Sequence, residues 1–171
     1  MWQYGLREYL KDRLVLFLDP NRDPLGGGYH LLKSKIAIGS GGLLGIGLLR
    51  GKLTNLQFIP EQHTDFIFSA LGEELGFVGC IIILFLLFFL IMKLINIAKS
   101  ARSDFESLIV IGIAATFLFQ IIINLFMTIG LGPVTGIPLP FMSYGRTSLV
   151  INFISIGFVL SIFKRSRSLR N

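Results

Sequence analysis

The stretch LGFVGCIIILFLLFFLIM, residues 75–92, runs for eighteen residues without a charge and decides the fold class. At about 1.5 Å per residue, a helix of this length crosses most of a hydrocarbon core of roughly 30 Å. Flanking residues up to Ala98 complete the span, and two further apolar runs follow at 108–131 and 148–163. The sequence therefore predicts an all-α integral membrane protein with three transmembrane helices.

The composition supports the same class. The chain of 171 residues is 53% hydrophobic and only 15% charged, whereas soluble domains carry about 25% charged residues. The net charge of +6 does not indicate a nucleic-acid partner, because four basic residues crowd the last eight positions, directly after an apolar run: Lys164, Arg165, Arg167 and Arg170. This placement is typical of a membrane-flanking segment. The single cysteine, Cys80, excludes a disulfide within the chain and a cysteine-based metal site.

The distribution of basic residues predicts the topology. The connector 98–107 and the tail after Phe163 are both basic, and two predicted helices separate them, so they share one side of the membrane. The loop 132–147 holds only Arg146 as a basic residue. The positive-inside rule places the connector and the C-terminus in the cytoplasm. Residues 1–74 and the loop 132–147 then face outward.

The chain divides into an outer region, 1–74, and a transmembrane region, 75–171, with spans near 75–98, 108–131 and 148–163. In the outer region, residues 4–18 have the pattern of an amphipathic helix that lies on the outer leaflet. The segment 36–49 is apolar, short and contains five glycines, which favours a re-entrant or interfacial element. No signal peptide is visible at the start, so we expect the chain to be part of a larger protein.

The Gly-rich stretch from Gly39 does not fit a nucleotide-binding loop. A dinucleotide fingerprint that starts at Gly39 requires glycine at position 44, which is leucine. A P-loop that starts at Gly47 is one residue too short, and Leu53 replaces the hydroxyl residue that binds magnesium. Close backbone packing at the membrane surface is the favoured interpretation.

The most informative polar cluster is Glu61, His63 and Asp65, about ten residues before the first span. If Pro60 opens a helix, Glu61 and Asp65 lie one turn apart on one face, where like charges raise one another's pKa. A carboxylate in such a setting can serve as a general base. The alternative is a solvated polar cap on a membrane helix. For His63 a structural hydrogen bond is favoured over metal ligation, because His30 is the only other histidine.

Small and polar residues recur every four positions along the second span: Gly112, Thr116, Gln120, Asn124, Thr128 and Gly132. Amides in hydrocarbon are costly unless they are buried in protein or in a wet cavity. Helix packing is the favoured interpretation of this stripe, and the lining of a substrate cavity is the alternative. The loop that follows carries three prolines in eight residues, which predicts a loop of fixed shape.

Several long motifs in order resemble the SEDS family of cell-wall glycan polymerases. PEQHTDFIF at 60–68, followed by GEELG at 72–76, looks like the family's large-outer-loop motif. TGIPLPFMSYG at 135–145 resembles its C-terminal signature, and DPLG at 23–26 and SKIAIGSGG at 34–42 also match. Within the family, GYH at 28–30 is more similar to the RodA branch than to the FtsW branch.

The resemblance implies glycosyl transfer between lipid II molecules on the outer membrane face, with the glycan on undecaprenyl pyrophosphate as donor. Asp65 matches the family's essential acid, the implied general base, and Glu61 is its implied tuning partner. The implied substrate-binding residues are His63, Thr64, Lys35, Arg50, Lys52 and Ser143, of which the three cations would assist the departing pyrophosphate. No nucleotide or organic cofactor is expected, and a divalent cation is left open. A class B penicillin-binding protein is the implied protein partner.

Two features depart from the family pattern. Family members have about ten membrane helices, so we expect no polymerase activity from these 171 residues alone. Arg146 stands where the family usually has a second glycine, which calls the shape of the local turn into question. Two other functions fit the sequence: a lipid II flippase, since polar stripes also suit transport, and a non-catalytic scaffold of the cell-wall machinery.

Overall fold

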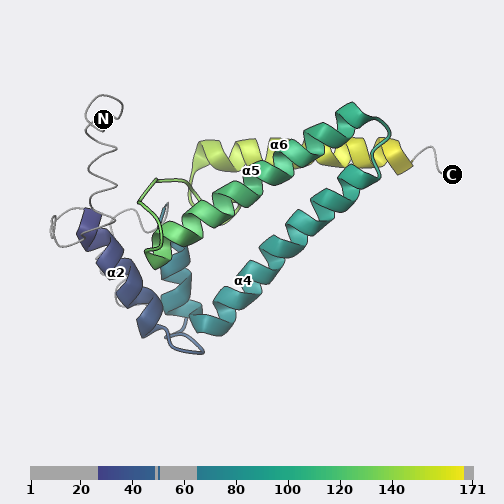
Figure 1. Cartoon of the computed structure of the whole chain (residues 1–171). Coiled ribbons are helices and arrows are strands. Elements are labelled where there is room, and N and C mark those ends of the chain that lie inside the picture. The colour runs from purple at the N-terminus through teal and green to yellow at the C-terminus, as the bar shows by residue number, and fades with distance from the viewer. Residues whose placement is uncertain (1–26, 49, 51–64, 168–171) are drawn as a thin grey trace, which may run out of the picture.

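The computed structural model describes residues 27–48, 50 and 65–167, and every regular element among them is a helix (Figure 1). The helices are α2 (Gly27–Ser40), α4 (Ile67–Lys99), α5 (Asp104–Ile129) and α6 (Arg146–Arg167). The last three are long and apolar enough to cross a membrane. The predicted all-α fold with three long apolar helices is therefore confirmed, and the predicted amphipathic helix at 4–18 lies outside the described residues.

Helix α4 begins at Ile67, eight residues before the predicted span, but it is broken at Gly76. Gly76 has φ 68° and ψ −168°, which interrupts the ladder of i to i−4 hydrogen bonds. The backbone groups freed by this break bond instead to the turn at 41–47. The four replacement bonds join Ile46 N to Glu73 O, Gly47 N to Glu74 O, Phe77 N to Gly42 O and Val78 N to Leu43 O, with distances from 2.9 to 3.1 Å.

The turn at 41–47 comes close to α4 because it consists largely of glycine. A Cβ added at Gly41 would collide with the carbonyl of Gly72, and one at Gly45 would collide with the carbonyl of Glu74. The close backbone packing predicted for the Gly-rich stretch is therefore present. Helix α2 lies beside the first part of α4, residues 67–75, which is set at an angle to the longer part (Figure 1). How deep this pair lies in the membrane stays a prediction.

The ends of α5 explain why this helix starts before the predicted span. Ser103 is the N-cap, and its hydroxyl accepts a hydrogen bond from the Glu106 amide at 3.2 Å. This first turn is acidic, and acidic side chains interact favourably with the positive end of a helix. Because these residues are not apolar, the apolar run begins only at position 108. Gly130, with φ 77°, ends the helix in the left-handed conformation that favours glycine.

The main core lies between the longer part of α4 and α5. Leu87, Ile91 and Leu94 of α4 are buried against Val110 and Phe117 of α5. Helix α6 packs more lightly against both, mainly through Val159. The outer faces of all three helices carry exposed leucine, isoleucine and phenylalanine, as expected for surfaces in contact with lipid or with further helices.

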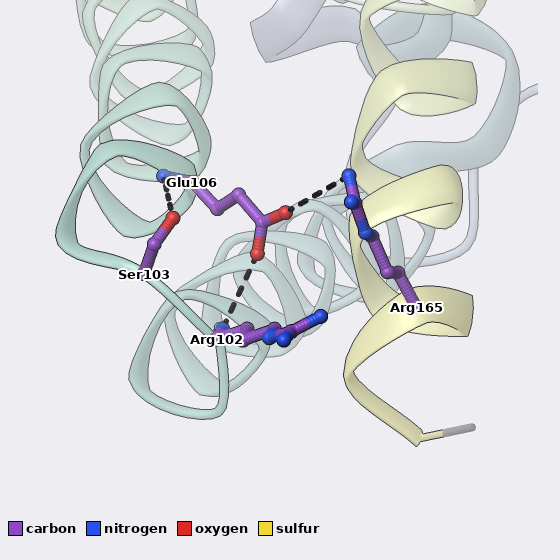
Figure 2. A network of polar contacts seen from close by, with 4 residues as sticks. All are labelled: Arg102, Ser103, Glu106 and Arg165. Atoms are coloured by element: carbon purple, nitrogen blue, oxygen red, sulfur yellow. Dashed lines mark hydrogen bonds and ion pairs between the residues drawn. The ribbon is translucent and has the colours of Figure 1, made fainter. Parts of the chain in front are cut away.

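The α4–α5 connector and the C-terminal part of α6 lie together at one end of the bundle (Figure 2). Glu106 accepts a hydrogen bond from the Arg102 amide at 3.3 Å and forms an ion pair with Arg165 at 3.8 Å. The Ser166 hydroxyl donates to the Ser100 carbonyl. The two basic segments therefore share one end, as predicted, and their placement in the cytoplasm stays a prediction.

Candidate functional site

Asp65 lies just before α4, at the end of the molecule opposite the α4–α5 connector. Its backbone carbonyl accepts a hydrogen bond from Nδ2 of Asn124 in α5, at 3.0 Å. Its side chain is partly exposed and lies over Gly136 of the proline-rich loop: a Cβ added at Gly136 would stand 3.2 Å from Asp65 Oδ2. The structure thus brings Asp65, the described acid of the PEQHTDF motif, against Gly136 of the C-terminal signature.

Gly136 allows this close approach for two reasons. It has φ 73°, a conformation that other residues adopt only with strain, and it has no side chain to displace the carboxylate. The carbonyl of the next residue, Ile137, accepts the second hydrogen bond of Asn124 Nδ2, at 2.8 Å. One amide therefore joins three segments: α5, the start of α4 and the 132–145 loop.

Ser143 supports the fold of this loop. Its buried hydroxyl oxygen accepts a hydrogen bond from the Leu139 amide at 2.8 Å, and its own amide donates to the Leu139 carbonyl at 3.0 Å. Phe141 has φ 62°, and its ring packs edge-on against Phe117 of α5 and Phe153 of α6. The loop is thus held by a local turn at 139–143 and by the Phe141 ring, which forms a wedge between α5 and α6.

A cavity of about 420 Å³ opens beside this loop. Its lining residues are Ile67, Phe141, Met142, Ser143, Tyr144 and Leu149. Most of the wall is apolar, and Ile67 lies two residues after Asp65. The segment that carries Asp65 thus reaches the wall of a space suited to an apolar group, and a hydroxyl-bearing amphiphile bound there could present its hydroxyl to Asp65.

Helix α2 is fixed to both neighbouring helices through Ser34. Its buried hydroxyl lies 2.5 Å from the hydroxyl of Ser69 in α4 and donates to the Thr128 carbonyl in α5 at 2.7 Å. Lys35, the next residue, extends past Gly130 at the end of α5. A cation there interacts favourably with the carbonyl end of a helix, and it stands at the same end of α5 as Asn124.

The other predicted cations and motif residues are distributed differently. Arg50 is exposed and its amide bonds to Gly47, which in turn bonds to Glu74. Seven residues of α4, 67–73, lie between Asp65 and Glu74, and the helix rises about 11 Å from Ile67 to Glu74. The structure therefore does not bring the backbone of Arg50 to the carboxylate. Four predicted site residues lie outside the described part of the chain: Lys52, Glu61, His63 and Thr64.

The stripe on the second span has two different halves. Asn124 and Thr128 are buried, and the Thr128 hydroxyl bonds within its own helix, to Asn124 O and Leu125 O. Thr116 is exposed and its hydroxyl bonds to Gly112 O, also within the helix. Helix packing, the favoured interpretation, is present at the Asn124 end. The four-residue stripe marks Asn124 as a buried amide, but no sequence pattern indicates its contact with Asp65.

Arg146 begins α6, and its side chain is exposed. Among the described non-glycine residues only Phe141 has a positive φ, so position 146 has no conformation that requires glycine. The first turn of α6, which contains Arg146, is closed by bonds to the Gly145 carbonyl from the Leu149 amide and the Ser148 hydroxyl. The departure from the family pattern at Arg146 therefore produces no strained backbone.

Comparison with known proteins decides the family. The sequence model of FtsW, RodA and SpoVE proteins, described as "Cell cycle protein", matches residues 1–168. The chain belongs to the FtsW/RodA/SpoVE family. This is the family that its motifs resemble, and its helices make it an integral membrane member.

Relatives within the FtsW/RodA/SpoVE family include enzymes of known name. The chain is 43% identical to the peptidoglycan glycosyltransferase MrdB of Escherichia coli K12 over 99% of this chain and 46% of that protein. It is 46% identical to the peptidoglycan glycosyltransferase RodA of Treponema pallidum, over 94% of this chain and 37% of that protein. It is 41% identical to the stage V sporulation protein E of Bacillus subtilis, over 93% of this chain and 43% of that protein. The chain thus spans less than half the length of these curated relatives.

A solved structure shares the fold of this FtsW/RodA/SpoVE member. It is described as "Structural coordination of polymerization and crosslinking by a peptidoglycan synthase complex". The TM-score is 0.76 at 34% identity, over 94% of this chain and 43% of that chain. The arrangement of α2, α4, α5 and α6 is therefore shared with a protein of that complex.

Proposed function

We propose that this chain carries the catalytic base of a peptidoglycan glycosyltransferase that polymerises lipid II. The observation that supports it most is the position of Asp65, whose carboxylate lies over Gly136 at the junction of the two family motifs. Relatives at 43% and 46% identity bear the name peptidoglycan glycosyltransferase. Lipid II is a hydroxyl-bearing amphiphile, which fits an acidic residue two positions before a residue that lines an apolar cavity.

In this proposal Asp65 accepts the proton of the GlcNAc 4-hydroxyl of one lipid II molecule. The oxygen then attacks the anomeric carbon of the donor glycan, and the bond from that carbon to undecaprenyl pyrophosphate breaks. The pyrophosphate leaves with the electron pair. A positioned general base contributes about 10²- to 10⁴-fold to such a step. Glu61 would tune the basicity of Asp65, while His63, Thr64 and Ser143 would contact the sugars.

Cationic residues would stabilise the departing pyrophosphate. Of the predicted cations, Lys35 has the most support for this role, since its side chain lies beside Gly130 at the end of α5 that also carries Asn124. Arg50 lies at the Gly76 end of the first part of α4. To contact the pyrophosphate, its side chain would have to extend toward Asp65 along this part of the helix; otherwise Arg50 has a different role. Lys52 keeps its proposed role from the motif alone.

The protein would act in the bacterial cytoplasmic membrane, with Asp65 on the outer face and the C-terminus in the cytoplasm. Basic residues in the connector and the tail support this orientation through the positive-inside rule. A class B penicillin-binding protein is the proposed partner. Its support is the related solved structure, whose description joins polymerisation with crosslinking in one complex.

The test is Asp65→Asn in the complete protein, with lipid II supplied on the accessible face. We expect glycan chain formation to fall about 100- to 10,000-fold. Asp104→Asn is the matched control, because Asp104 is an exposed acid in the first turn of α5, at the other end of the molecule. Polymerisation at the parental rate by the Asp65 variant would falsify the assignment. If that variant also retained transbilayer movement of lipid II, the flippase function would gain support.

A further inference from the structure

Asn124 is a buried amide in the otherwise largely apolar helix α5. Its side chain is fully buried, and both N–H groups of Nδ2 are used, one for the carbonyl of Asp65 and one for the carbonyl of Ile137. Both partners are acceptors, so the amide cannot be turned around: the opposite orientation would place Oδ1 against two carbonyl oxygens. The geometry therefore defines which end of the amide faces the site.

This arrangement carries a cost that a purely structural residue would avoid. Oδ1 of Asn124 is buried and has no hydrogen-bond partner within the described part of the chain. A buried oxygen without a hydrogen-bond partner lowers the stability of the fold, whereas a leucine of similar size at this position of a membrane helix carries no such cost. Thr128, one turn away, satisfies its hydroxyl within its own helix. Asn124 alone of these two directs its donors to other segments.

The two bonds fix the surroundings of the Asp65 carboxylate from both sides. One holds the backbone of Asp65 itself, and the other holds Ile137, whose neighbour Gly136 lies against Asp65 Oδ2. Without the amide, the loop and the start of α4 could shift relative to each other. A displacement of about 1 Å at a reacting group costs about 10²-fold in rate.

We propose that Asn124 is a positioning residue that sets the location of the Asp65 carboxylate relative to the 132–145 loop. This inference rests on the proposed role of Asp65 as general base. Asn124 touches no reacting atom, so it acts on the rate of the chemical step through Asp65. Substrate affinity depends on other contacts and is retained when Asn124 is replaced.

The test measures kcat and KM for lipid II polymerisation by the complete protein carrying Asn124→Leu or Asn124→Ser. The serine variant avoids an inserted apolar group and can bond within the helix, as Thr128 does. We expect kcat to fall about 10- to 100-fold while KM changes less than about twofold. Asn124→Gln keeps the donors and is expected to recover part of kcat. Thr128→Val is the control, because the Thr128 side chain is equally buried in α5 but bonds only within its own helix, and we expect it to keep the parental kcat.

A double-mutant cycle separates positioning from general loss of structure. Asp65→Glu already displaces the carboxylate, so adding Asn124→Leu to it should cost less than the product of the two single losses. Parental kcat in both the leucine and the serine variants overturns the inference, as does a fall shared equally by Thr128→Val. If Asp65→Asn itself retains polymerisation, the proposed function fails first. If Asp65→Asn is inactive while the Asn124 variants are fully active, only the positioning role fails.

Discussion

The two ends of the helix bundle are held together by different kinds of contact. At the Asp65 end, Asn124 is fully buried and bonds to two backbone carbonyls at 3.0 and 2.8 Å. At the connector end, Glu106 and Arg165 form an ion pair at 3.8 Å, with side chains 15% and 71% exposed. Buried hydrogen bonds are costly to lose, whereas an exposed ion pair contributes little and is screened by salt.

The difference indicates which end of the bundle tolerates little change in backbone geometry. At the Asp65 end, close contacts are made by backbone atoms and glycines, which have few alternative arrangements. At the connector end, long side chains on the surface join the segments, and they can adjust without moving a helix. We therefore expect substitutions at the Asp65 end and at the Gly76 break to have larger effects than those near Glu106.

The largest effect is expected for Gly76→Ala. Its positive φ strains any other residue, and a Cβ would collide with the backbone of the 41–47 turn. We expect a loss of about 3 kcal/mol in the free energy of unfolding, measured by thermal denaturation in detergent. Gly112→Ala is the control, because a Cβ there meets nothing within 4 Å and the residue lies within α5. Equal melting temperatures for the two variants would show that the break is not fixed by this contact.

An intermediate effect is expected for Ser34→Ala. The change removes the donor to the Thr128 carbonyl and the contact with the Ser69 hydroxyl, both of which are buried. A loss of about 1–2 kcal/mol follows, since buried partners are left without a hydrogen bond. Ser155→Ala is the matched control, because Ser155 bonds only within its own helix, to Ile151 O. The comparison of melting temperatures checks it, and a larger shift for Ser155→Ala would contradict the prediction.

The smallest effect is expected for Glu106→Gln at the connector end. The glutamine keeps the acceptor for the Arg102 amide and removes only the charge that attracts Arg165. We expect a loss of about 0.5 kcal/mol at low salt, which disappears at high salt. Thermal denaturation at two ionic strengths measures it. A loss above that of Ser34→Ala would reverse the proposed ranking of the two ends.

The sequence predicts the long helices because their apolar runs carry the signal of a membrane span. It does not predict the start of α4 at Ile67, since Ser69, Glu73 and Glu74 interrupt the apolar pattern there. Nor does it predict the break, because Gly79 in the same helix has no such conformation. The break depends on the 41–47 turn, which supplies the replacement hydrogen bonds.

The candidate site shows the same division. The motif resemblance indicates Asp65, and the stripe on the second span predicts that the Asn124 amide is buried. Their contact joins residues 59 positions apart, and no local pattern encodes such a pairing. The separation of Arg50 from Asp65 likewise follows from the bond of the 41–47 turn to Glu74, at the far end of the first part of α4 from Asp65, which only the folded structure reveals.

The wedge formed by Phe141 has a consequence for the order of assembly. A bulky residue at φ 62° is unfavourable by about 1–3 kcal/mol. Its two edge-on ring contacts, with Phe117 and Phe153, contribute about 0.5–1.5 kcal/mol each. Neither contact alone offsets the strain reliably, so the loop can settle only after both α5 and α6 have docked. During biogenesis, the segment that lies against Asp65 is therefore among the last parts of this region to reach its final shape.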